Sequence, residues 1–224
     1  MTGLMMKDAL VMRKTLRLYA LFLLFYSGLA VLGVFPMSIA LAMVEVIVMV
    51  LPISSFSYDE AAKWDRYAAV LPVGRTAVVK ARYLFLLLVL LAAAAIGLVG
   101  SILASLLARE DLGELLATLL VSMGLGLMIA DIMLPVVYQL GPERARPWMY
   151  VIIFAPIVVL LGGAKLGLFD GIDLSWLDQL PELAVLGVFA LVPLVPLVGM
   201  LLSCWISCSC LLYTSPSPRD RTRS

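Results

Sequence analysis

The sequence predicts an all-α integral membrane protein with about six transmembrane helices. The 224 residues are 63% hydrophobic and only 14% charged, which is far outside the composition of a soluble domain of this length. The apolar residues also occur in long runs, whereas a transmembrane β-barrel would show short segments of alternating polarity. Backbone groups inside hydrocarbon must form hydrogen bonds within their own segment, so we expect these runs to be helices.

The apolar runs have the length that a bilayer crossing requires. About 17 to 25 helical residues span a hydrocarbon core of about 30 Å. The predicted spans are residues 18–35, 37–53, 83–107, 115–138, 148–166 and 183–206, within one transmembrane domain of residues 1–206. Pro36 alone separates the first two spans, where its fixed φ and missing N–H suit a tight reversal.

The positive charges predict how the chain is oriented. Of its 16 Lys and Arg residues, only Arg109 and Lys165 fall between spans on one side of the membrane. Loops that remain in the cytoplasm retain most of the positive charge, so both termini are expected to be cytoplasmic. An even number of spans agrees with that arrangement. The basic start and first apolar run are expected to be an uncleaved anchor and not a signal peptide.

The first sixteen residues carry apolar side chains at helical spacing, with charged residues elsewhere around the turn. This pattern suits a helix lying in the membrane interface before the first span. A basic flank that only fixes orientation is an equal alternative.

The segment 54–82, between the second and third spans, is predicted to be cytoplasmic and organised. At 100° per residue, one face of a helix over 58–71 is apolar and the opposite face charged, and Pro72 and Gly74 then end it. The apolar face holds Tyr58, Ala61, Trp64, Ala68 and Leu71, and the charged face holds Asp59, Lys63 and Arg66. Such a helix could rest on lipid headgroups, but the interspersed acids favour docking onto a protein.

The second cytoplasmic loop, residues 139–147, is predicted to be short and stiff. Gly141 and Pro142 end the fourth span, and Glu143, Arg144 and Arg146 carry charge. By itself this pattern indicates a turn with charges that fix orientation.

Two acids are predicted at membrane depth, Glu45 in the second span and Asp131 in the fourth. A charged group near the bilayer centre costs on the order of 2.5 to 3.5 kcal/mol, so each should face the bundle interior or a wet cavity, or be protonated. Each could contact a substrate or cation, or hold a proton. Alternatively, each forms a structural hydrogen bond to a neighbour such as Ser122 or Tyr138.

No catalytic, cofactor-binding or metal-binding residues are predicted. The chain contains no histidine, which excludes His-based zinc sites and Ser-His catalysis. It also lacks the G-x-x-x-x-G-K-[ST] phosphate loop. The ending, residues 207–224, is expected to be disordered or non-native and receives no function.

Two motifs and the opening of the chain resemble a known family. The first motif is LPISSFSYDEAAKWDRYAAVLPVGRTAVVKARYL at 51–84, the second is IMLPVVYQLGPERAR at 132–146, and the opening is KDALVMRKTLRLY at 7–19. They resemble the small six-span permease subunits of bacterial ABC exporters of the ABC-2 type.

The resemblance implies a bacterial plasma-membrane permease, not an enzyme, that works with a second permease, either a homodimer or a paralogue. A separate ABC ATPase would bind ATP and Mg²⁺, and no nucleic acid is expected as a partner. The ATPase-coupling residues would be Tyr58, Asp59, Glu60, Lys63, Trp64, Asp65 and Arg66, with Gly141, Pro142, Glu143 and Arg144 in a secondary loop.

Two other functions are compatible with the residues. An ion-coupled secondary transporter would use Glu45 and Asp131 as its coupling groups, and broken helices at matching positions would support it. A non-transporting membrane anchor or assembly protein would show no substrate-dependent effect on an ATPase.

Overall fold

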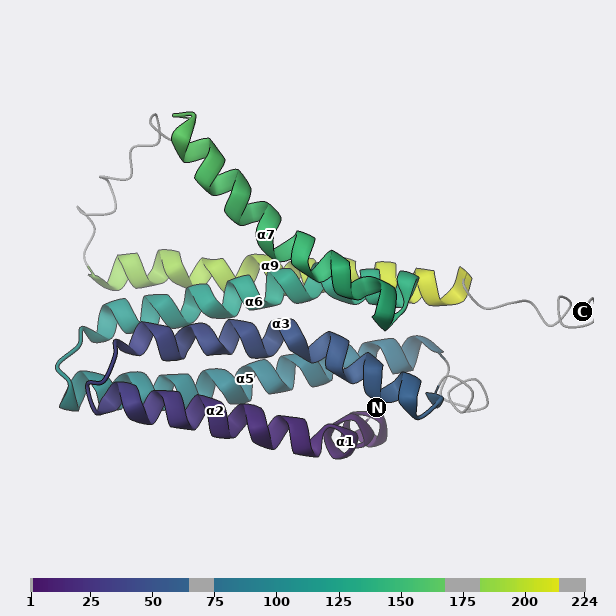
Figure 1. The fold of residues 1–224 in the computed structure, drawn as a ribbon, viewed down its shortest axis with the longest axis horizontal. Coiled ribbons are helices and arrows are strands. Elements are labelled where there is room, and N and C mark those ends of the chain that lie inside the picture. The colour runs from purple at the N-terminus through teal and green to yellow at the C-terminus, as the bar shows by residue number, and fades with distance from the viewer. Residues whose placement is uncertain (1, 65–74, 168–181, 214–224) are drawn as a thin grey trace, which may run out of the picture.

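The computed structural model describes residues 2–64, 75–167 and 182–213, and within these ranges it is helical and contains no strand (Figure 1). This confirms the predicted fold class. The helices are α1 (Thr2–Val11), α2 (Arg13–Val31), α3 (Met37–Ala61), α5 (Arg75–Leu107), α6 (Leu112–Leu140), α7 (Pro142–Lys165) and α9 (Glu182–Tyr213).

The long helices run alternately up and down the molecule. Helix α1, the end of α3, the start of α5, the α6–α7 junction and the end of α9 lie together at one end of the bundle (Figure 1). We call this the basic end, because Lys7, Arg13, Arg82 and Arg146 belong to it. The opposite, acidic end carries Glu110 and Asp111.

Among the residues that the structure describes, five helices are long and apolar enough to cross a membrane. They are α2, α3, α6, α5 from Thr76 and α9 between Gly187 and Ser209. Helix α7 covers the remaining predicted span, 148–166, but is not among these five. It packs on α6 and α3 near the basic end and then diverges from the bundle (Figure 1).

Four predicted boundaries are wrong. The ending predicted to be disordered or non-native from residue 207 is helical as far as Tyr213, where α9 ends, and the rest of that ending lies outside the described residues. Pro36 does not separate the first two spans by itself, because α2 already ends at Val31 and the reversal includes Gly33 at φ 75°. Helix α3 does not end at residue 53 but continues through Pro52 to Ala61. The loop 139–147 is reduced to Gly141, whose φ of 78° suits glycine, and Pro142 already begins α7.

The start of the chain forms a separate helix, as predicted. Helix α1 ends at Val11, and Met12 is only 1% exposed where the chain turns into α2. Helix α1 packs mainly against α5, so it is part of the helical bundle.

Helix α6 lies at the centre of the core and packs most extensively against α9 and α3. Small residues permit this close approach. A Cβ atom at Gly124 would lie 2.7 Å from Val192 of α9, and one at Gly126 would lie 3.2 Å from Val48 of α3. These two glycines therefore face different neighbours.

Candidate functional site

The segment predicted to couple to a partner does not form one helix. Residues 58–61 are the last turn of α3, and the chain then turns at Lys63, whose φ is 52°. The prediction of a helix over 58–71 is therefore wrong at Ala62 and Lys63, which form a turn. Asp65 and Arg66 lie outside the described residues, so their predicted roles remain predictions.

The charged face of this last turn points inward. Asp59 is only 9% exposed, whereas the neighbouring Tyr58 is 38% exposed. The sequence placed Asp59 on the charged face of a partner-binding helix, whereas in the structure cations from two other helices reach it inside the bundle.

Four side chains form a buried ion cluster at the basic end, namely Lys7, Asp8, Asp59 and Arg82. The Arg82 guanidinium donates a hydrogen bond to the Asp59 carboxylate and lies 4.0 Å from that of Asp8. The Lys7 ammonium lies 2.8 Å from both carboxylates. Two positive and two negative charges thus compensate one another, which buried charges require.

The ion cluster joins three helices, α1, α3 and α5. Arg82 is only 4% exposed, so its charge is enclosed by the bundle. Sequence reasoning also missed the roles of Lys7 and Asp8. One property of the sequence could have indicated these roles. Acids such as Asp8 and Asp59 are costly near the membrane unless cations pair with them, so nearby cations were to be expected.

Aromatic rings surround the ion cluster. The Arg82 guanidinium lies 4.0 Å from the centre of the Phe56 ring, and Phe56 packs edge-on against Tyr138. The Lys7 ammonium lies 4.2 Å from the centre of the Trp64 ring. Cations over aromatic faces are attracted by about 0.5 to 2 kcal/mol, more where water is excluded. Trp64 is thereby held against α1.

The remaining coupling candidates lie at the same end. Glu60 and Lys63 are exposed at the end of α3, and Glu143 and Arg144 are exposed at the start of α7. The Tyr58 hydroxyl forms a 2.8 Å hydrogen bond with that of Thr15 on α2. The basic end therefore brings the two predicted cytoplasmic segments to one surface, with exposed charges around the buried ion cluster.

The two intramembrane acids occupy different surroundings. Glu45 is partly buried on α3, where its backbone approaches Gly126 of α6. Asp131 on α6 faces Gly199 of α9, and its carboxylate oxygens are buried without a hydrogen-bond partner among the described residues. The predicted hydrogen bond from Asp131 to Ser122 or Tyr138 is therefore absent from the described part of the chain.

A network of hydroxyl groups lies next to Asp131. Ser203 of α9 donates a hydrogen bond of 2.6 Å to the backbone carbonyl oxygen of Asp131. The Tyr83 hydroxyl of α5 is 2.6 Å from the Ser203 hydroxyl and 2.9 Å from that of Ser207. This network links α5, α6 and α9 inside the bundle, and no pattern in the sequence predicts it.

The fold and the polar end define a class: a multi-pass, all-helical membrane protein with a charged surface at one end of its bundle. A family model for ABC-2 family transporter proteins matches residues 3–211, nearly the whole chain. The chain therefore belongs to the ABC-2 transporter family and is a permease subunit of an ABC transporter. Searches of the curated proteins and of the solved structures each found no match.

Proposed function

We propose that this chain forms the substrate path of a bacterial ABC exporter and is driven by a separate ATPase that docks at the basic end. Membership of the ABC-2 family implies an ABC ATPase partner. The sequence has no phosphate-binding loop of its own, so ATP and Mg²⁺ would bind to that partner. The chain itself would then perform no hydrolysis.

The observation that carries the proposal is the ion cluster under the end of α3. A force applied to the exposed Glu60 and Lys63 acts on a helix that continues without interruption into the membrane. The same turn is fixed to α1 and α5 through Asp59. Coupling requires rigid elements that move together, and this arrangement supplies three.

A second permease subunit would complete the path. Helix α7 diverges from the bundle (Figure 1) and exposes apolar side chains such as Val151 and Phe154. We infer that a homodimer or a pair with a related permease encloses the route between two such bundles. ATP binding would then favour one arrangement of the helices over another by differential affinity.

The proposed location is the bacterial plasma membrane, with the basic end in the cytoplasm. Positive charges concentrate at this end, and cytoplasmic loops retain them. An ATPase that uses cytoplasmic ATP could reach the exposed end of α3 only in this orientation.

Copurification with the ATPase tests the proposal. The chain is coexpressed with a candidate ABC ATPase from its own genome, and ATPase recovery and ATP hydrolysis are measured in lipid nanodiscs. A partner surface that is complementary to Lys63 would be acidic. Lys63→Glu should therefore lower ATPase recovery about tenfold, because like charges brought together across an interface cost up to several kcal/mol. Trp64→Ala should also lower recovery, because it removes the contact between the Trp64 ring and the Lys7 ammonium on α1.

Arg109→Glu is the matched control. Arg109 is also exposed, also basic and also has a positive φ, 58° against 52° for Lys63, but it lies at the acidic end. Recovery should stay unchanged in this variant. Equal recovery from the Lys63→Glu, Trp64→Ala and unmodified proteins would refute docking at this surface.

A further inference from the structure

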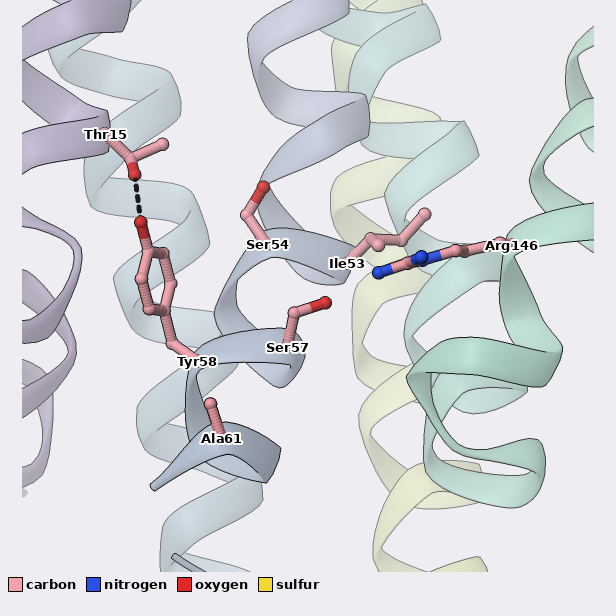
Figure 2. Close-up of a pocket in the computed structure, with 7 residues that line it drawn as sticks. All are labelled: Thr15, Ile53, Ser54, Ser57, Tyr58, Ala61 and Arg146. Atoms are coloured by element: carbon pink, nitrogen blue, oxygen red, sulfur yellow. Dashed lines mark hydrogen bonds between the residues drawn. The ribbon is translucent and has the colours of Figure 1, made fainter. Parts of the chain in front are cut away.

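A groove opens at the basic end between α2, α3 and α7. It has a volume of about 410 Å³ and is lined by Thr15 on α2, by Ser54, Ser57 and Tyr58 on α3, and by Arg146 on α7. Figure 2 shows the Arg146 guanidinium reaching toward Ser57, whose hydroxyl points back toward it. Thr15 and Tyr58 close the other side through their hydrogen bond.

The lining is suited to an anion. Arg146 carries a fixed positive charge and forms no ion pair within the described part of the chain, and Ser57 adds a hydroxyl donor. Guanidinium groups bind phosphate oxygens through paired hydrogen bonds. Among the exposed charged residues on the basic ends of these three helices, cations outnumber acids: Arg13, Lys14, Arg17, Lys63, Arg144 and Arg146 against Glu60 and Glu143.

Beyond the groove, helical spacing places an apolar stripe on the same face of α3. Ile53 lines the floor of the groove, and Val50, Val46 and Ile39 follow at helical spacing toward the acidic end, with Val46 and Ile39 exposed at 43% and 46%. On α7, Trp148 is 50% exposed one half-turn beyond Arg146. Tryptophan is enriched at the level of the lipid headgroups, so Trp148 indicates that the groove lies at that level of the membrane.

We propose that this groove binds the phosphate of an anionic phospholipid from the leaflet at the basic end. The phosphate would accept hydrogen bonds from Arg146 and Ser57, and an acyl chain would lie along Val50 and Val46. An acidic peptide would also satisfy Arg146, but it would leave the apolar stripe without a matching group. A phospholipid matches both parts in one molecule.

This binding would place a lipid between two helices that contact α3 from opposite sides. Helices α2 and α7 both pack against α3, and the groove lies between them. A bound headgroup would therefore fix the spacing of α7 from α2. The proposal requires only that the chain spans a membrane and does not depend on ATPase docking.

Native mass spectrometry of the purified full-length chain in mild detergent tests the proposal. Phosphatidylglycerol and the zwitterionic phosphatidylethanolamine are each titrated, and the lipid-bound fraction is measured. Arg146→Gln should weaken phosphatidylglycerol binding about tenfold, as expected from the loss of a charged hydrogen bond. Ser57→Ala should weaken it less. The control is Arg17→Gln, an exposed cation two residues from Thr15 and outside the groove lining.

Selective weakening in Arg146→Gln, with Arg17→Gln like the unmodified chain, supports the proposal. Equal binding by the Arg146→Gln and unmodified proteins overturns it. Saturation by glycerol phosphate at concentrations as low as those of the lipid would show a site for free phosphate esters and overturn the lipid assignment. Loss of ATPase recovery in Arg146→Gln without loss of lipid would show a peptide site and overturn it as well. Size-exclusion profiles check that each variant is folded.

Discussion

Arg82 at the start of α5 pairs with Asp59 at the end of α3, and both side chains lie in the interior of the basic end. Helix α3 ends at Ala61, so no continuous helix links the two residues along the chain. The pair therefore supplies a direct link between two membrane-crossing helices. Loss of this pair should mainly lower the stability of the protein and, as a second effect, its coupling to an ATPase.

Substituting Arg82 by Met should destabilise the protein by about 3 to 5 kcal/mol, because it leaves the Asp59 carboxylate buried with one cation fewer. The measurement is the thermal denaturation midpoint in detergent, followed by size-exclusion chromatography. The control is Lys80→Met on the same helix, where an exposed charge should contribute less than about 1 kcal/mol.

The double variant Asp59→Leu/Arg82→Met should recover much of the stability lost by Arg82→Met alone. Replacing a buried ion pair by apolar groups is often close to neutral, because neither charge remains unpaired. Lys7 and Asp8 would still pair with each other at 2.8 Å. A double variant as unstable as the single variant would show that the guanidinium acts through its contact with Phe56 instead.

The end of α3 shows how far the sequence alone could lead. Helical periodicity correctly places Tyr58 and Asp59 on different faces of the helix, because successive residues lie 100° apart around its axis. It does not tell which side faces the interior. The cations that turn Asp59 inward come from α1 and α5, and such distant pairs leave no periodic signal in the sequence.

Backbone conformation explains the other differences. Helix α3 continues through Pro52, although proline usually weakens a helix, because the residues around it are buried in the bundle. The turn at Lys63 has a positive φ although the residue is not glycine, so the sequence does not indicate the turn. Apolar runs, in contrast, do not depend on distant partners. The fold class and five of the six apolar runs that match candidate spans in the described residues could therefore be predicted, although the ends of the helices could not.

The close packing of α6 on α9 predicts that Gly124 tolerates no side chain. A Cβ atom there would come within 2.7 Å of the Val192 side chain and 3.0 Å of its backbone oxygen. Gly124→Ala should therefore cost about 1 to 3 kcal/mol, the usual penalty of overpacking. Thermal denaturation in detergent measures this change.

Gly28→Ala is the matched control for that substitution. Gly28 also lies within a helix, but nothing lies within 4 Å of the position that its Cβ would occupy. Alanine should be neutral there or stabilise by up to about 1 kcal/mol, because it favours the helix. Equal losses in both variants would show that glycine matters for the helix itself and not for its packing.

Substituting Asp131 by Asn should leave transport and folded yield unchanged. The carboxylate has no hydrogen-bond partner among the described residues, and an energy supply from ATP requires no titrating acid in the membrane. Transport in membrane vesicles at matched expression measures the effect. Glu45→Gln is assayed in parallel. Loss of transport in either variant, with normal yield, would favour the ion-coupled alternative.

The orientation predicts which end of the bundle reagents can reach. In a variant with Cys204, Cys208 and Cys210 replaced by Ala, a single cysteine at Arg109 should react with a membrane-impermeant maleimide on intact cells. A single cysteine at Lys63 should react only after permeabilisation, because the basic end faces the cytoplasm. Both positions are exposed, so a difference in labelling reports sidedness and not burial. The reverse labelling pattern would place the end of α3 outside the cell, where no ATPase could dock on it.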